Sequence, residues 1–122
     1  MNYTKRYMEV KPKVVRIYQR RNGDLPFVNW IKGLRDLRGK QKIEARVDRV
    51  RSGNLGDHAP VGEGVTELRL QFGPGYRVYL GQEGDTFVVL LCGGDKSTQD
   101  EDIKKAKSYW KDYQNEKTYA NG

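Results

Sequence analysis

Three cations have types and a spacing that suit phosphate chemistry. Arg69 and Arg77 lie in two runs of alternating apolar and polar residues that a Gly-Pro-Gly turn joins, and Lys96 follows the next apolar run. Because side chains alternate between the two faces of a strand, we expect both arginines on the polar face of a hairpin. Neighbouring strands lie about 4.8 Å apart, so the two guanidinium groups can reach one phosphate. Lys96 precedes a predicted helix, whose N-terminal N–H groups attract anions.

Each candidate also has a purely structural interpretation. The cations can be solvated charges of a sheet face, with Arg69 pairing with Glu67. Tyr79 lies two residues beyond Arg77 on the same face, where it can stack on a base, donate a proton or pack as a half-buried cross-strand aromatic. His58 is the single histidine. It is a candidate general acid or base because its unperturbed pKa lies near neutrality, and otherwise an ordinary loop residue.

A second group of cations falls on one predicted helix. Lys42, Arg46 and Arg49 recur at helical spacing between about Lys40 and Arg51. They form a basic stripe at roughly 100° from the apolar positions, given 3.6 residues per turn. Such a stripe predicts contact with RNA, DNA or an acidic partner, and the alternative is a solvated helix face.

The usual enzyme and metal motifs are missing. The sequence contains no P-loop, no HExxH and no CxxC pair. One histidine cannot build a histidine-rich metal site, and the single cysteine, Cys92, excludes an intramolecular disulfide and a multi-cysteine zinc site. Cys92 lies in an apolar run, which predicts a buried free thiol. Gly93-Gly94 is a weak phosphate-loop signal, and a turn that takes the chain out of the sheet is the alternative. We therefore expect no metal and no cofactor.

Length and charge set the broad class. The chain has 122 residues and a formal net charge of +7, which suits one domain with a polyanionic or an acidic protein partner. No apolar run approaches the ~18 residues of a membrane span, and the first residues lack the apolar core of a secretory signal. The sequence predicts a cytoplasmic protein without a membrane partner.

Hydrophobic periodicity predicts an α/β (α+β) domain in the order βααβββα, with mainly antiparallel pairing. The expected elements are a strand within Lys13–Gln19, a helix capped by Asp24, a helix over Lys40–Arg51, a loop over Asn54–Gly64, three strands within Val65–Cys92, and a helix from Thr98 with Thr98 and Glu101 as its capping box. We expect residues 1–12 as a flexible basic arm, 13–113 as the folded domain and 114–122 as a polar tail.

Three segments of the chain resemble a known family. They read LPFVNWIKGLRD, GNLGDHAPVGEGVTELRLQFGPGYRVYL and VVLLCGGDKSTQDEDIKKAKSYW. In this order and spacing they resemble the addiction-module killer proteins of the RelE/ParE superfamily of type II toxins, in the subgroup related to HigB and to phage-derived proteins. The resemblance covers about residues 13–113. It implies a RelE-like fold with two N-terminal helices, a mainly antiparallel sheet and a C-terminal helix.

The resemblance also implies an activity and partners. Most toxins of the RelE and HigB type cleave messenger RNA on the ribosome without a metal, and the ribose 2′-hydroxyl attacks the adjacent phosphate. The implied function is therefore a ribosome-dependent mRNA endoribonuclease, or mRNA interferase. The implied partner is a cognate antitoxin of the helix-turn-helix DNA-binding type, which neutralises the toxin and is its only link to operator DNA.

Four residues take expected roles from the family's motifs. Arg77 in GYRVY matches the phosphate-stabilising arginine of the family. Arg69 in ELR falls, after a one-residue shift, where RelE-type enzymes have a basic strand residue near the attacking hydroxyl. Because arginine stays protonated, its expected role is electrostatic stabilisation. Lys96 in GGDKST is a candidate acid or phosphate clamp, and Gln99 is a candidate substrate-positioning residue.

The sequence departs from the family pattern in two places. The late catalytic tyrosine of RelE has no match in the segment STQDED, and Ala59 stands beside His58 where relatives often carry lysine. These differences keep two alternatives open. One is a ParE-like toxin that lacks nuclease activity and inhibits DNA gyrase by binding to it. The other is a degenerate toxin that acts only as a corepressor with its antitoxin.

Overall fold

The structure, a computed structural model, describes residues 11–121, with side chains as far as Glu116. The arm predicted for residues 1–12 therefore lies outside the described residues except for its last two, and so does the final residue of the predicted tail. The elements in chain order are β1 (Val14–Ile17), α1 (Pro26–Gly33), α2 (Leu37–Arg51), β2 (His58–Gly62), β3 (Val65–Arg69), β4 (Tyr76–Glu83), β5 (Phe87–Asp95), the short 3₁₀ helix η2 (Lys96–Thr98) and α3 (Gln99–Asn121).

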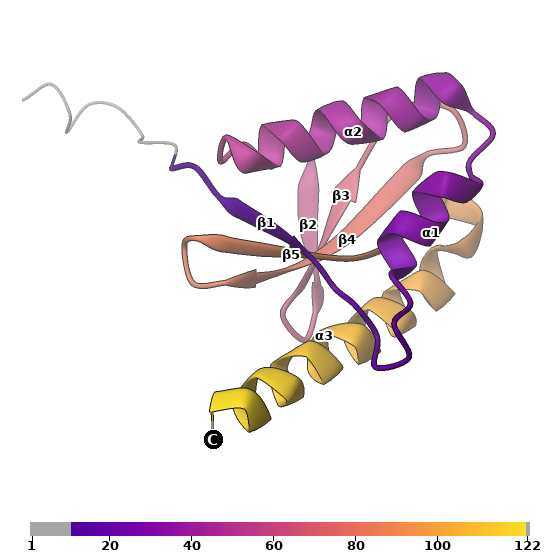
Figure 1. The fold of residues 1–122 in the computed structure, drawn as a ribbon. Helices are drawn as coiled ribbons and strands as arrows, with labels where there is room; N and C mark the ends of the chain where they lie inside the picture. The colour runs from indigo at the N-terminus through magenta and orange to yellow at the C-terminus, as the bar shows by residue number, and fades with distance from the viewer. Residues whose placement is uncertain (1–10, 122) are drawn as a thin grey trace, which may run out of the picture.

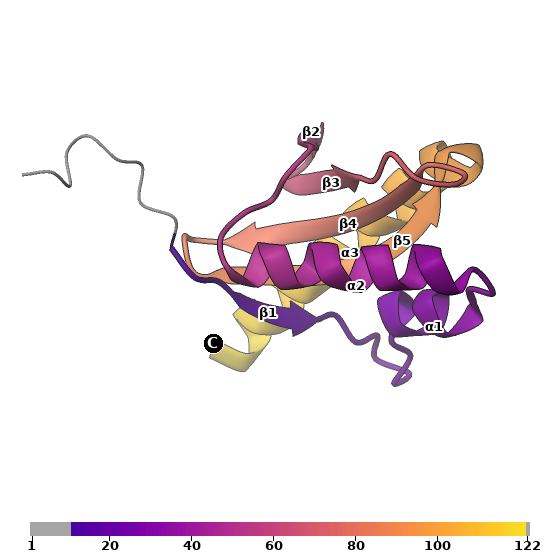
Figure 2. The same cartoon turned by 90° about the horizontal axis from the view of Figure 1, so that it is seen from above.

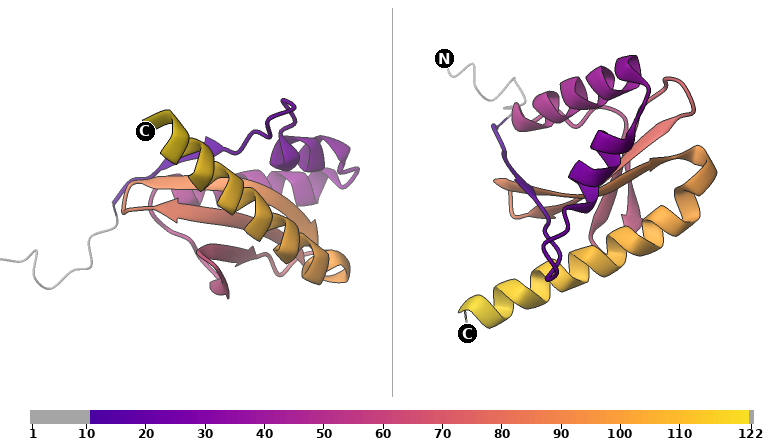
Figure 3. Two further views of the ribbon diagram at one scale, coloured as in Figure 1. Left: turned by 90° about the horizontal axis from the view of Figure 1, so that it is seen from below. Right: turned by 45° about the vertical axis from the view of Figure 1, so that its right-hand side comes forward.

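These elements form three layers (Figures 1 and 2). The middle layer is a five-stranded sheet in the order β1-β5-β4-β3-β2, antiparallel except for the parallel β1–β5 pair. Helices α1 and α2 cover one face of the sheet, and α3 crosses the other face (Figure 3). The predicted mixed α/β class and mainly antiparallel pairing are confirmed. No helix in residues 11–121 combines the length and the apolar character that a bilayer crossing requires.

Each face of the sheet has its own hydrophobic core. The predicted apolar stripe of α2 packs on one face, where Ile43, Val47 and Val50 meet Leu68, Val78 and Leu80. The predicted stripe of α3 packs on the other, where Ala106 and Trp110 meet Val65, Val89 and Leu91. Both faces of β3 and β4 are therefore packed against helices. The polar face that was predicted for the hairpin lies under α3, and only part of it reaches solvent.

The Gly93-Gly94 pair lies inside β5, so both the turn and the phosphate-loop interpretations are wrong. A register shift in the β4–β5 pairing leaves Leu91 and Cys92 both in the α3 core. A Cβ at Gly93 would lie 2.2 Å from the ring of Trp30 in α1, and one at Gly94 would lie 1.9 Å from a carboxylate oxygen of α3. The strand carries glycine here because side chains from both helical layers pack directly on its backbone.

One strand was not predicted. β2 lies in the segment expected as a loop, and its residues pair with β3 in antiparallel register. The glycine and proline content favoured the loop, but Pro60 is tolerated because β2 is an edge strand, where a missing N–H need not break a ladder bond. The element order is therefore βααββββα.

Helix capping also differs from the prediction. Asp24 does not cap α1, whose N-cap is Leu25 without a side-chain hydrogen bond. Asp36 starts α2 at Leu37, three residues earlier than expected, because its Oδ1 accepts a hydrogen bond of 3.0 Å from the Gly39 N–H. At the start of η2 the carboxylate of Asp95 is the cap.

Asp36 also ties the β3–β4 hairpin to α2. The Tyr76 hydroxyl donates a hydrogen bond of 2.7 Å to Asp36 Oδ2. Burial, together with this bond and the nearby carboxylate charge, raises the pKa of Tyr76 to about 12. The Gly39 N–H and the Tyr76 hydroxyl both stabilise the ionised carboxyl group and lower the pKa of Asp36. The pair therefore holds the hairpin with one neutral and one ionised partner.

We expect the Tyr76–Asp36 bond to make stability fall at alkaline pH. The pKa of Tyr76 is about 12 in the folded chain against a reference value of 10.0. Between these values the unfolded chain loses the proton that the folded chain retains, so the free energy of unfolding decreases as pH rises. The free energy of unfolding, measured with urea, should be compared between the wild type and Tyr76→Phe. The difference, wild type minus variant, should decrease by on the order of 1 kcal/mol across this pH window. A difference curve that is flat from neutral to strongly alkaline pH would contradict the assignment.

Candidate functional site

The two arginines of the predicted phosphate site face each other across β3 and β4. Arg69 pairs with Arg77 in the antiparallel register, which places both side chains on the α3 side of the sheet. The Arg69 side chain is 37% exposed and that of Arg77 only 7% exposed. Arg77 Nη1 donates to the carbonyl oxygens of Gly75 and Tyr76, each at 3.1 Å. The predicted juxtaposition is present, with one guanidinium at the surface and one behind it.

A buried carboxylate lies at the centre of this cluster. Glu67 Oε1 is 3.6 Å from Arg69 Nε and 3.9 Å from Arg77 Nε. Its Oε2 accepts hydrogen bonds from the Tyr79 hydroxyl at 3.0 Å and from Gln99 Nε2 at 2.8 Å. Both arginine Nε atoms are buried without a hydrogen-bond partner, so Glu67 attracts them as a charge and does not bond to them directly.

Tyr79 belongs to the core and not to an exposed face. It is fully buried, and its hydroxyl is used by Glu67. Burial in the first place, and the neighbouring Glu67 carboxylate in the second, raise the pKa of Tyr79 far above its ordinary value. The expectation that it stacks on a base is therefore wrong, because no face of its ring is open to solvent. The expectation of a proton donor is also disfavoured, because the ionised form that would follow is strongly destabilised.

Lys96 stands at the exposed edge of the cluster. A Cβ on Gly75 would lie 3.0 Å from Lys96 Cδ and 3.4 Å from Arg77 Nη1, so the absence of a side chain there lets the lysine stem pass beside the arginine. The acidic residues Asp100, Glu101 and Asp102 occupy the first turn of α3. They offset the positive end of this helix, so the cationic side chains, and not the helix terminus, supply the positive potential.

His58 does not join the cluster. It pairs with Leu68 across the β2–β3 register, and Leu68 faces the α2 core, so the imidazole projects from the side of the sheet opposite to Arg69. The ring is exposed, and its Nδ1 lies 2.7 Å from the carbonyl oxygen of Gly56. A role for His58 in chemistry at the arginine pair is therefore not compatible with this fold.

The basic stripe of α2 divides into one structural and two exposed residues. Arg46 is buried, and its guanidinium donates to the carbonyl oxygens of Leu55, Asp57 and Arg69, with Nη1 of Arg46 lying 2.9 Å from the Arg69 oxygen. Burial lowers the pKa of Arg46, and the positive charge of Arg49 acts in the same direction. The predicted RNA contact is wrong for Arg46, because its donors are used inside the protein. Lys42 and Arg49 remain exposed.

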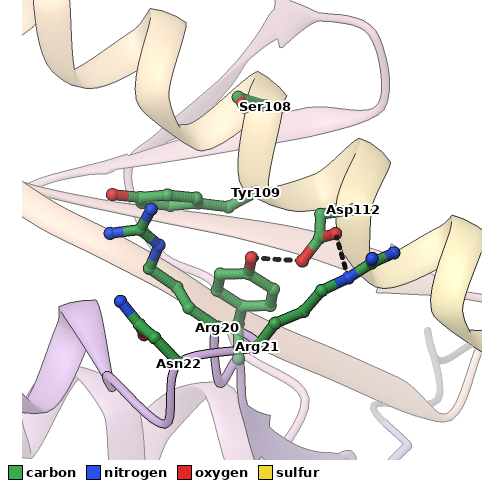
Figure 4. A pocket seen from close by; sticks show the side chains of 7 residues that line it. Arg20, Arg21, Asn22, Ser108, Tyr109 and Asp112 are labelled. Carbon is green, nitrogen blue, oxygen red and sulfur yellow. Dashed lines mark hydrogen bonds and ion pairs between the residues drawn. The ribbon is translucent and has the colours of Figure 1, made fainter.

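In a hollow on the α3 side of β1, Tyr18 and Arg21 both pair with Asp112 (Figure 4). The hydroxyl of the buried Tyr18 donates to Asp112 Oδ2 at 2.5 Å, and Arg21 Nε lies 3.7 Å from Asp112 Oδ1. Arg20 forms a weak ion pair with Asp24 at 4.0 Å. These contacts hold the turn after β1 against α3, so we read the hollow as a structural junction.

The prediction of a buried thiol is confirmed. Cys92 is buried in the α3 core, and burial raises its pKa to about 12. Among the described residues, no three histidine, cysteine or acidic side chains lie together in a way that would hold a metal ion.

Glu67 is the residue that the sequence interpretation underrated. Alternation places it on the face of Arg69, two residues before it, and this signal supported only the structural interpretation. The additional information is the β3–β4 register, which sets Glu67 opposite Tyr79 and thereby next to Arg77. Asp102 is a second residue that the sequence did not single out, and it packs on Gly94 and accepts a hydrogen bond of 2.6 Å from Thr98.

Comparison with known proteins gives a relative of this chain. A protein of Haemophilus influenzae, itself described as uncharacterized, is 54% identical over 83 residues, which are 68% of this chain and 84% of that protein. The chain belongs to the family of this Haemophilus influenzae protein. No family model matches the sequence. No solved structure matches it either.

Proposed function

We propose that the chain is the toxin of a type II toxin–antitoxin module and acts in the cytoplasm as a ribosome-dependent mRNA endoribonuclease. The observation that carries the proposal is the arginine pair, in which Arg69 and Arg77 project from facing positions of two strands with Lys96 beside them. The mixed α/β fold with a mainly antiparallel sheet and the resemblance of the sequence to the RelE/ParE superfamily support the proposal. A helix-turn-helix antitoxin is the proposed partner that neutralises the toxin.

In the proposed reaction the ribose 2′-oxygen attacks phosphorus and the bond to the 5′-oxygen of the next nucleotide breaks, leaving a 2′,3′-cyclic phosphate and a 5′-hydroxyl. Negative charge grows on the non-bridging oxygens, where the exposed Arg69 and Lys96 can bind and Arg77 adds to the field from behind. The Lys96 ammonium can return a proton to the leaving oxygen. Glu67 is the carboxylate nearest to both arginines and the candidate acceptor of the 2′-hydroxyl proton, once Gln99 uncovers its Oε2.

A specific observation favours the second candidate, a ParE-like toxin that inhibits DNA gyrase by binding. Glu67 is 4% exposed, Tyr79 is fully buried, and His58 lies on the other side of the sheet. A toxin that only binds a protein needs no exposed proton carrier next to its arginines. The two candidates are therefore distinguished by whether the protein cleaves RNA.

We expect Arg69→Gln to abolish RNA cleavage without unfolding the chain. Arg69 is partly exposed, so its loss should cost little stability, whereas removing one charge-stabilising group from such a site lowers the rate by about 10²-fold. The measurement is induced expression followed by mapping of RNA 5′ ends, with Arg77→Lys as a second variant that keeps the charge and loses the planar fork.

The matched control is Lys111→Gln, which removes an exposed cation from the outer side of α3. New 5′ ends should persist in this control and disappear in the two arginine variants. If Arg69→Gln still arrests growth while translation continues and DNA damage accumulates, the nuclease proposal is wrong and gyrase inhibition is supported. If the wild type affects neither growth, translation nor DNA, the corepressor role is supported.

A further inference from the structure

A small cationic hollow lies on the opposite side of the sheet from the arginine pair. It has a volume of about 260 Å³ and lies between α2 and the residues that follow β3, lined by Lys42, Ala45, Arg46, Arg49, Leu70, Gln71 and Phe72. None of these lining residues carries a carboxylate. The hollow beside β1 contains Asp112, and the apolar groove between α1 and α2 is edged by Glu44 and Asp48. Of these three hollows, only the one beside α2 is lined by cations without a carboxylate, so it is the one suited to bind an anion.

The cations of the hollow lack neutralising partners of their own. The side chain of Arg49 has no hydrogen bond or ion pair with any described residue, and Lys42 contacts an aromatic ring, its ammonium lying 4.9 Å from the centroid of Phe72. Arg46 adds its charge from the floor while its donors stay with backbone carbonyls. Asp57 is the carboxylate that acts on Arg46, more weakly than burial and Arg49 do. A bound anion would relieve this mutual repulsion.

The hollow is also connected to the proposed catalytic cluster. Arg46 Nη1 donates to the carbonyl oxygen of Arg69, so the floor of the hollow and the exposed arginine are attached to the same end of β3. The chain then turns through residues 72–75 into β4. A strand of RNA with one phosphate at Arg69 can therefore pass around this turn and present a phosphate further along the strand to Lys42 and Arg49.

We propose that this hollow is a second subsite for single-stranded RNA, in which Lys42 and Arg49 bind a further backbone phosphate of the strand held at the arginine pair, and Phe72 holds the lysine over the opening. The inference rests on the proposed ribonuclease function for the identity of the strand. The subsite contributes affinity and register and takes no part in bond breaking. It fits a phosphate better than a whole nucleotide because the ring of Phe72 is already covered by an ammonium.

The test is the salt dependence of RNA binding, measured by fluorescence anisotropy with a labelled single-stranded 2′-O-methyl RNA that cannot be cleaved. Each cation that contacts a phosphate contributes about 0.7 to the slope of log K against log salt concentration. Lys42→Gln and Arg49→Gln should each lower the slope by about 0.7 and weaken binding about fivefold at 0.1 M salt. Phe72→Leu should weaken binding about twofold, since the charge remains and its position is lost. Lys111→Gln, on the other face of the sheet, should leave the slope unchanged.

The outcomes separate this inference from the proposed function. A normal slope in Lys42→Gln and Arg49→Gln with a lowered slope in Arg69→Gln overturns the subsite and leaves the ribonuclease proposal intact. A lowered slope in the α2 variants with no effect of Arg69→Gln supports the subsite and removes RNA from the arginine pair. Equal losses with duplex DNA of the same length overturn the subsite, because the hollow would then be a surface for any polyanion.

Discussion

Replacing Arg46 by leucine is expected to destabilise the fold more than any other single change to a charged residue of α2. The guanidinium donates to three carbonyl oxygens, those of Leu55 at 2.9 Å, Arg69 at 2.9 Å and Asp57 at 2.5 Å. A buried acceptor left without a partner costs about 1–3 kcal/mol, and hydrogen bonds from a charged donor lie at the upper end. Since some of these oxygens can recover a water molecule, we expect a loss of about 3–5 kcal/mol in the free energy of unfolding.

The same helix offers a matched control for this prediction. Arg49→Leu removes an exposed arginine three residues further on and should change stability by less than about 0.5 kcal/mol. Arg46→Lys should fall between the two, because an ammonium on a flexible stem cannot match three carbonyls that a planar fork satisfies. The midpoint of urea unfolding, with the slope m held as a check on two-state behaviour, measures all three. Equal midpoints for the Arg46 and Arg49 variants would show that these bonds contribute no net stability.

Arg46 illustrates why the sequence could identify a basic stripe and not its use. Periodicity assigned Arg46 correctly to the side of α2 that also carries Lys42 and Arg49. Whether such a residue meets water or protein depends on the loop 54–57, whose carbonyls turn toward the helix only in the folded chain. That information is tertiary, and a one-dimensional pattern does not contain it.

The hairpin was predictable because its geometry is local. A period of two sets the side of each residue, and a short turn sets which residues face one another, so the juxtaposition of Arg69 and Arg77 followed directly. The covering of that face by α3 did not follow, because nothing in β3 or β4 says which face a distant helix will choose. For this reason the sequence left three roles open for Tyr79, and the structure agrees with the packed cross-strand aromatic. It has the alternation of an exposed residue and the environment of a core residue.

The glycines of β5 show a second limit. In the sequence alone, Gly93 and Gly94 are typical of a turn, because glycine usually weakens a strand. Here successive residues of the strand face opposite helical layers, so Trp30 fills the space of the missing Cβ atom at Gly93 and Asp102 that at Gly94. The physical cause is close packing between segments that are far apart in sequence.

Glu67→Gln is expected to have the second largest effect, because it removes the negative charge between two arginines. Opposite charges about 4 Å apart attract by about 4 kcal/mol at an effective dielectric constant of 20, and Glu67 Oε1 lies 3.6 and 3.9 Å from the two Nε atoms. Glutamine keeps the size and one acceptor for Tyr79 or Gln99. We expect the free energy of unfolding to fall by about 2–4 kcal/mol, measured by urea unfolding. The matched control, Glu44→Gln on the exposed side of α2, should lower the free energy of unfolding by less than about 0.5 kcal/mol.

A double-mutant cycle shows which arginine Glu67 holds. The two distances are similar, but the side chain of Arg77 is 7% exposed and that of Arg69 is 37% exposed, so solvent screens the second pair more strongly. The coupling energy of Glu67→Gln with Arg77→Gln should therefore exceed that with Arg69→Gln, which we expect below about 1 kcal/mol. A larger coupling to Arg69 would mean that Glu67 neutralises the exposed guanidinium as well. The cluster would then be an internal ion network, and Arg69 would have little charge left to offer an RNA phosphate.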